Sequence, residues 1–184
     1  MAKPAKKARV VSSKVVYRGP VFHVTTDQLV EPGGIKARRD VVRHSGSVVI
    51  MAVEERRGAE PRVLLARQYR HPTQRYLWEL PAGRIDEGES PLAGAKRELI
   101  EETGYTAQKW KRVLYFWASP GFLDETMSLY LATGLCRGKA TPEEDESIVI
   151  RMFPLSAVVR MILNGRIQDG KTIAGVLWLA QSRR

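Results

Sequence analysis

The sequence predicts an α/β fold in which helices cover a mixed sheet, preceded by a small antiparallel strand unit. Residues 14–17, 21–29 and 35–42 are rich in β-branched side chains and are separated by Gly- and Pro-containing turns, which is typical of antiparallel strands. After Gly88 the period of the apolar residues changes from two residues to about 3.6 residues, which indicates a helix. Strands followed by one helix, more strands and final helices favour a mixed sheet with helices packed on it.

The remaining elements follow in order along the chain. Ser90 can cap a helix that begins at Pro91, and Gly104 can end it just after Thr103. Two further helices are expected at residues 155–164 and 171–181. Strands are expected at residues 47–53, 62–68, 76–80, 110–118, 127–133 and 148–153.

Length and composition predict one main domain with a small addition. The 184 residues, 43% of them hydrophobic, can bury a single core. We expect a basic flexible tail at 1–12, the strand unit at 13–45 and the main domain at 46–184. The strand unit is too thin to bury both faces, so it must pack on the rest of the protein or on a second subunit. The single Cys136 excludes an internal disulfide or a multi-cysteine zinc cluster.

The charge distribution leaves two interpretations of the N-terminal segment open. Seven of the ten net positive charges lie in residues 1–45, which would suit contact with nucleic acid or a membrane surface. A solvated tail is favoured for residues 1–12, because no aromatic side chain lies between the lysines. No apolar run approaches the roughly 20 residues of a membrane helix. We therefore expect a soluble, cytoplasmic protein without a membrane or nucleic-acid partner.

Three glutamates share one face of the helix expected after Pro91. Glu98 and Glu102 are i and i+4, and Glu101 lies beside them within a sector of about 100°. Like charges this close repel, and Arg97 is expected to point away, so a bound cation would relieve them. Ligands that are all oxygen suit Mg²⁺ or Mn²⁺. The alternative is a solvated acidic helix face that binds nothing.

Residues 83–105, GRIDEGESPLAGAKRELIEETGY, resemble the signature of the Nudix hydrolase family. That signature is G-x5-E-x7-R-E-U-x-E-E-x-G-U, where U is a bulky apolar residue. The resemblance implies a Nudix α/β/α sandwich over residues 46–184 that hydrolyses nucleoside diphosphates linked to another group. The matching positions are Gly83, Glu89, Arg97, Glu98, Leu99, Glu101, Glu102 and Gly104.

The resemblance also implies the roles of these residues. Glu89 and Arg97 would pair to brace the loop before the helix, and Gly83 would let the backbone turn. Divalent metal would neutralise the diphosphate and lower the pKa of a bound water. The implied metal ligands are the Ala82 carbonyl, Glu98, Glu101 and Glu102.

Features outside the signature resemble the ADP-ribose pyrophosphatase subgroup. Pro120 and Gly121 stand in a Ser-Pro-Gly run, which taken alone is an ordinary turn. Arg70, in the run QYRHP, would contact substrate phosphates, the alternative being a surface arginine. The strand unit would swap between subunits of a homodimer, where Arg39 belongs to a loosely matching stretch that binds the adenosine end.

The catalytic base is expected in an acidic loop, because the subgroup takes it from a loop after the proline. Residues 142–146 read PEEDE. Glu144 is the first candidate, Glu146 the second, and Glu101 is a further candidate for a catalytic role. The alternative for any one of the loop acids is an exposed acidic turn.

The expected activity is metal-dependent hydrolysis of the diphosphate bond of a nucleoside diphosphate sugar, first of all ADP-ribose to AMP and ribose 5-phosphate. GDP-mannose or another sugar nucleotide is the main alternative. Two further alternatives are a protein that binds or processes RNA 5′ ends and a catalytically silent ADP-ribose sensor. Residues 165–172 also fit the phosphate-loop pattern G-x4-G-K-T, but a helix is expected before them. An interhelical turn with Asp169 near the next N-cap is expected instead.

Overall fold

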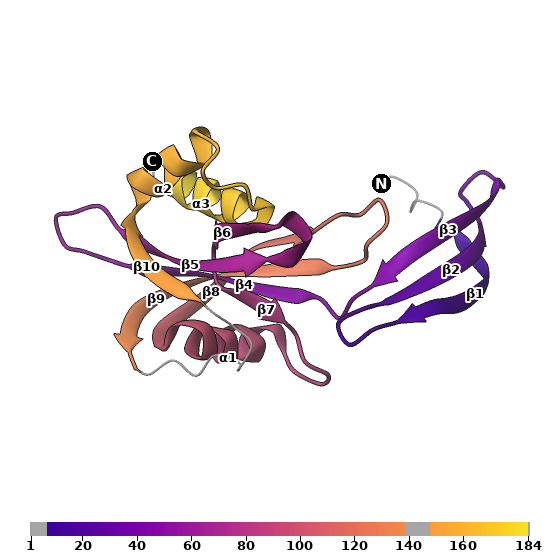
Figure 1. Ribbon diagram of the computed structural model, residues 1–184, viewed down its shortest axis with the longest axis horizontal. Coiled ribbons are helices and arrows are strands. Elements are labelled where there is room, and N and C mark those ends of the chain that lie inside the picture. The colour runs from indigo at the N-terminus through magenta and orange to yellow at the C-terminus, as the bar shows by residue number, and fades with distance from the viewer. Residues whose placement is uncertain (1–6, 139–147, 184) are drawn as a thin grey trace, which may run out of the picture. The chain divides into compact units, whose positions relative to one another are not determined.

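The computed structural model describes residues 7–138 and 148–183 of the chain (Figure 1). These residues form two compact units. The N-terminal unit is the chain up to Gly46 together with Trp117–Thr126, and the sandwich unit is Ser47–Phe116 together with the chain from Met127 onward. Trp117–Thr126 thus belongs to the N-terminal unit although it is far from that unit in the sequence.

The N-terminal unit is an antiparallel sheet of β1 (Arg9–Arg18), β2 (His23–Val30) and β3 (Lys36–Arg43), in that order. Residues 9–12 were expected in the flexible tail, but they belong to β1. The reason is that β2 extends to Val30 and supplies backbone partners, with Arg9 opposite Val30. The segment from Trp117 joins this unit through β3, because the Val42 N–H donates to the Phe122 carbonyl at 2.8 Å.

The sandwich unit is built on a mixed sheet, as expected. Its central order is β10-β5-β4-β9-β8, with β6 paired to β5 and β7 paired to β4. Strands β4 and β9 run parallel, while the pairs of β5 with β4, β6 and β10 are antiparallel. A single 3-10 turn, η1 (His71–Thr73), connects β5 to β6. The strands are β4 (Ser47–Glu54), β5 (Arg62–Arg70), β6 (Arg75–Glu79), β7 (Ala82–Arg84), β8 (Tyr105–Trp117), β9 (Thr126–Arg137) and β10 (Val149–Pro154).

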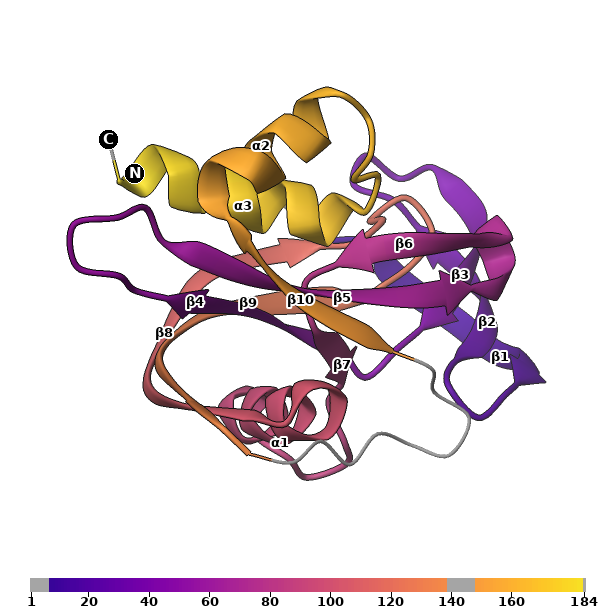
Figure 2. The same cartoon turned by 60° about the vertical axis from the view of Figure 1, so that its left-hand side comes forward.

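Helices cover both faces of this sheet, which confirms the α/β/α sandwich. Helix α1 (Pro91–Thr103) lies on one face, and α2 (Leu155–Leu163) and α3 (Gly170–Ser182) lie on the other (Figures 1 and 2). Alternate side chains of the buried strand β4 reach opposite faces. Ile50 packs in a cluster with Leu99 of α1, whereas Met51 packs with Val158 of α2 and Val176 of α3. None of the helices in the described part of the chain is long and apolar enough to cross a membrane.

Candidate functional site

The loop from β7 into α1 and the second half of α1 carry the three candidate glutamates. The helix begins where expected: Ser90 has extended backbone geometry, and its hydroxyl accepts a hydrogen bond from the Ala93 N–H at 3.3 Å. It ends at Gly104, whose φ of 69° is a left-handed conformation that glycine adopts without strain. Local capping therefore fixes how α1 starts and stops, and with it the positions of Glu98, Glu101 and Glu102.

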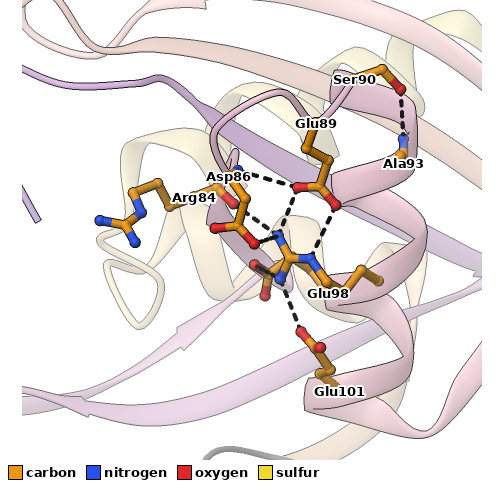
Figure 3. A network of polar contacts seen from close by, with 8 residues as sticks. Arg84, Asp86, Glu89, Ser90, Ala93, Glu98 and Glu101 are labelled. Atoms are coloured by element: carbon orange, nitrogen blue, oxygen red, sulfur yellow. Dashed lines mark hydrogen bonds and ion pairs between the residues drawn. The ribbon is translucent and has the colours of Figure 1, made fainter.

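One arginine holds the acidic side chains of this segment together. Arg97 donates from Nη1 to Glu98 at 2.7 Å and to Glu101 at 2.9 Å. Its Nε and Nη2 donate to the two Glu89 oxygens at 3.1 and 2.9 Å, and Nη2 also reaches the Arg84 carbonyl at 3.1 Å. Figure 3 shows Glu89, Glu98 and Glu101 converging on this guanidinium from the loop and from the helix. The sequence-based pairing of Glu89 with Arg97 thus agrees with the geometry.

The expectation that Arg97 points away from the glutamate face was wrong. Its long side chain bends back along the helix, which brings the guanidinium to Glu98 and, one turn on, to Glu101. Hydrogen bonding with Glu89 and then with Glu98 and Glu101 raises the pKa of Arg97 above its ordinary value. The same contact with Arg97 lowers the pKa of Glu89. The protein itself therefore relieves part of the repulsion among the glutamates, which a bound cation alone was expected to relieve.

Gly83 and Glu98 fit against each other without room for another atom. A β-carbon on residue 83 would lie 2.0 Å from both Cδ and Oε1 of Glu98. Strand β7 places Gly83 opposite Val48 and Ala82 opposite Val49 of the buried β4. The missing side chain of Gly83 thus lets the Glu98 carboxylate lie directly against the backbone of β7.

The donors in this region fit a hard divalent cation. Glu98, Glu101 and Glu102 lie within two turns of α1, and Glu102 is only 8% exposed. In the described ranges no three His, Cys, Asp or Glu side chains are arranged as a metal site. Arg97 donates to one carboxylate oxygen of Glu98 and to one of Glu101. Carboxylate and carbonyl oxygens are the ligands that Mg²⁺ prefers, so the chemistry of the donors suits such an ion.

Arg70 stands at the end of β5 in a second ionic cluster of the sandwich unit. Its Nε and Nη2 donate to the two carboxylate oxygens of Glu79 at 3.0 and 2.9 Å. These bonds raise the pKa of Arg70, and the nearby negative charge of Glu102 adds to the shift. Glu79 also forms an ion pair with the ammonium group of Lys171, the second residue of α3. Arg70 is thus a fixed guanidinium within the electrostatic reach of Glu102.

Sequence reasoning missed Glu79 and Lys171 as parts of this cluster. Glu79 lies in the run WELPAG, and Lys171 lies in the glycine-lysine-threonine run taken for an interhelical turn. That turn is confirmed: α2 precedes it, and Asp169 caps α3 by accepting from the Thr172 N–H at 3.0 Å. The sequence shows only a lysine two residues after the N-cap Asp169, and nothing local points to its partner, which is 92 residues away along the chain.

Three of the predicted substrate-binding residues line one pocket of the N-terminal unit. The pocket has a volume of about 380 Å³ and is walled by β3 and by the segment that follows Trp117. Arg39 contributes from β3, and its Nη2 donates to Glu31 at 2.7 Å. Pro120 and Gly121 contribute from the other wall. The two candidates for the catalytic base, Glu144 and Glu146, lie outside the described residues.

Comparisons with known proteins agree with this geometry. The model of the NUDIX domain family matches residues 43–176. The chain is 41% identical over 171 residues to the ADP-ribose pyrophosphatase of Mycobacterium tuberculosis, with 91% of this chain and 80% of that protein covered. It is also 34% identical over 173 residues to the methanol dehydrogenase activator of Bacillus methanolicus, covering 93% and 91% of the two chains.

A solved structure shares the fold. The crystal structure of an ADP compounds hydrolase superposes with a TM-score of 0.81 at 21% identity, covering 98% of this chain and 96% of that one. The family model spans well over half of the chain, including β4–β7, all of α1 with its carboxylates, and the start of α3. The chain belongs to the Nudix hydrolase family.

Proposed function

We propose that this protein hydrolyses the diphosphate bond of a nucleoside diphosphate sugar, and that its substrate is ADP-ribose, which yields AMP and ribose 5-phosphate. The observation that carries the proposal is the carboxylate face of α1, held by the Arg97–Glu89 brace and seated against Gly83. The 41% identity with an ADP-ribose pyrophosphatase supports the choice of substrate.

Nudix hydrolases use divalent metal ions, and we assign Mg²⁺ or Mn²⁺ to this one. Glu98, Glu101, Glu102 and the Ala82 carbonyl would hold the ion. When bound, such an ion neutralises the diphosphate and lowers the pKa of a water molecule for attack on phosphorus. Arg97 keeps Glu98 and Glu101 on one side of α1, so that these two carboxylates are oriented before substrate arrives.

Two arginines, Arg70 and Arg39, would bind the substrate, and each is held by a carboxylate of the protein. Arg70 would contact the phosphates, where a planar, permanently charged guanidinium suits the phosphate geometry. Arg39, Pro120 and Gly121 would bind the substrate through the pocket that they line. A carboxylate must take the proton of the attacking water. Glu144 is the first candidate for this base, followed by Glu146. Glu101 is a further candidate for a catalytic role, beside its role as a metal ligand.

The protein is proposed to act as a homodimer in the cytoplasm, formed through the strand unit. All ten residues of β1 are exposed in the single chain. Val10, Val11, Val15 and Val16 are among the exposed large apolar side chains, and such surfaces mark protein interfaces. Sedimentation of the full chain should give twice the mass of 20.7 kDa. A monomer at micromolar concentration would contradict the dimer.

The experiment that tests the function is product identification across a substrate panel with Mg²⁺. The panel contains ADP-ribose, GDP-mannose, diadenosine polyphosphates, a nucleoside triphosphate and a 5′-triphosphate RNA, with chromatography of the products. ADP-ribose converted to AMP well ahead of the others is the expected result. Preference for GDP-mannose or for the RNA would replace the substrate assignment. No turnover of any compound would contradict the enzymatic function and favour an ADP-ribose sensor.

A further inference from the structure

A buried carboxylate next to Arg70 is shared by two cations. Glu79, at the end of β6, is 4% exposed and accepts both hydrogen bonds from Arg70. The Lys171 ammonium contacts Glu79 Oε2, the oxygen that Arg70 Nη2 also contacts. The side chain of Lys171 is 9% exposed, whereas that of Arg70 is 39% exposed. The arginine therefore stands at the more accessible end of the cluster, and the lysine is largely covered.

The N-terminus of α3 holds Lys171 rigidly. Asp169 lies 3.1 Å from the Lys171 ammonium through one oxygen and caps α3 through the other. The Thr172 hydroxyl accepts the Leu80 N–H at 2.7 Å, which ties the helix to the residue after Glu79. A β-carbon on Gly175 would meet Leu129 at 2.7 Å and Leu80 at 2.9 Å, so the helix packs closely on this part of the sheet. The backbone that carries Lys171 is thus held in place next to Glu79.

The two cations compensate the burial of Glu79 together. Burial alone would raise the pKa of Glu79, but the hydrogen bonds from Arg70 and the charge of Lys171 hold it below its ordinary value. With both present, the carboxylate occupies the Nε and Nη2 edge of Arg70. Because the side chain is 39% exposed, an anionic ligand would approach Arg70 from the opposite edge, which carries Nη1.

We propose that Lys171 is a positioning residue for Arg70, which by sharing Glu79 sets the orientation and the effective charge that Arg70 offers to the substrate diphosphate. The proposal rests on the proposed function, in which Arg70 contacts the phosphates. Without the lysine, Arg70 would remain as the single cation among the described residues that pairs with Glu79. Its guanidinium would be drawn toward Glu79, and its charge would be neutralised more completely. Substrate binding would weaken, while the groups on α1 would be unchanged.

The kinetic test compares Lys171→Met with a matched variant, Lys109→Met, which removes an exposed lysine on β8. Lys171→Met should raise KM for ADP-ribose about tenfold with kcat within about threefold, which is the signature of lost binding. Lys109→Met should change neither. In an Arg70→Met background the lysine substitution should alter KM less than about twofold, because it acts through the arginine. Independent, multiplying effects or a loss confined to kcat would overturn the proposal.

A second measurement does not depend on turnover. The Nε–Hε resonance of Arg70, assigned with Arg70→Met, should be sharp and slowly exchanging in the free protein and should shift or broaden in Lys171→Met. An unchanged resonance would overturn the positioning role even if the enzyme hydrolyses ADP-ribose. If ADP-ribose stays intact, the proposed function fails, while the resonance still decides the role of the lysine. Should Lys171→Met not fold, Lys171→Gln keeps a donor to Glu79 without the charge and should show the same effects.

Discussion

The Glu98 carboxylate occupies the space that a side chain on Gly83 would fill. Its Cδ and Oε1 would both lie 2.0 Å from a β-carbon on residue 83, closer than any real contact. The glycine lies on β7, which pairs with the buried strand β4. A shift of its backbone away from Glu98 would therefore disturb this pairing. Gly83 therefore sets where Glu98 lies, and through Arg97 it also affects Glu101.

Gly83→Ala should abolish most of the activity by displacing Glu98. A misplacement of about 1 Å at a reacting centre can cost on the order of 100-fold in rate, so kcat should fall by about that factor. Steady-state hydrolysis of ADP-ribose measures it. Gly170→Ala is the control, because a β-carbon there meets nothing within 4 Å. Wild-type turnover in Gly83→Ala would show that Glu98 can move without consequence.

Glu89 should stabilise the fold in a pH-dependent way. Hydrogen bonds from Arg97 hold the pKa of Glu89 below its ordinary value of 4.5, so the ionised form favours the folded state. This stabilisation is complete above pH 4.5 and disappears as the pH falls through the lowered pKa. Glu89→Gln should therefore cost about 1.5–3 kcal/mol near neutrality and progressively less in acid.

Urea unfolding of the wild type and Glu89→Gln at several pH values measures that difference. Glu87→Gln, which changes an exposed acid in the same loop, is the control and should be neutral at every pH. The difference in unfolding free energy between wild type and Glu89→Gln should shrink in acid. If it stayed constant down to about pH 2, well below the ordinary carboxyl range, the ionic brace would be contradicted.

Thr172→Val should destabilise the protein through a buried backbone donor. Thr172 is fully buried, and its hydroxyl accepts the Leu80 N–H. An isosteric valine leaves that N–H without an acceptor, which costs about 1–3 kcal/mol. Chemical denaturation should show this loss, whereas Thr106→Val, on an exposed position of β8, should change little. Equal stability of the two variants would contradict the attachment of α3 at Leu80.

Several features of the fold could be predicted from the sequence because their causes are local. The caps of α1 are single residues next to the helix, so Ser90 and Gly104 mark its ends without tertiary information. The apolar run after Ser47 predicts a strand at 47–53. The structure buries this strand, with helices packed on both of its faces. The Nudix signature likewise identifies α1 and its brace from one continuous segment.

Other features depend on contacts between distant segments. The bond of Lys171 to Glu79 spans 92 residues, and the attachment of Asp124 to Arg43 spans 81. The periodicity of apolar residues along the sequence is a local pattern and does not indicate such pairings. The error on Arg97 has a different cause: a helical wheel gives the direction of the Cα–Cβ bond, whereas a long flexible side chain can bend toward the charge that attracts it.

Arg39→Ala should weaken substrate binding without slowing the chemical step. Arg39 lines the pocket of the N-terminal unit with Pro120 and Gly121. Loss of one charged contact should raise KM for ADP-ribose about tenfold and leave kcat within about threefold. Lys36→Ala removes the same charge from the same strand outside the pocket lining and is the control. Identical KM values for the two variants would remove the pocket from the substrate-binding site.

The most direct test of the account is the turnover of Glu102→Gln beside that of Glu87→Gln. Glu102 is buried on the carboxylate face of α1, and Glu87 is exposed in the loop before it. With Mg²⁺ and ADP-ribose, Glu102→Gln should lose at least about 100-fold in kcat while circular dichroism shows a folded protein. Glu87→Gln should match the wild type. Turnover of Glu102→Gln within a few-fold of wild type would contradict the claim that the α1 carboxylates hold the catalytic metal.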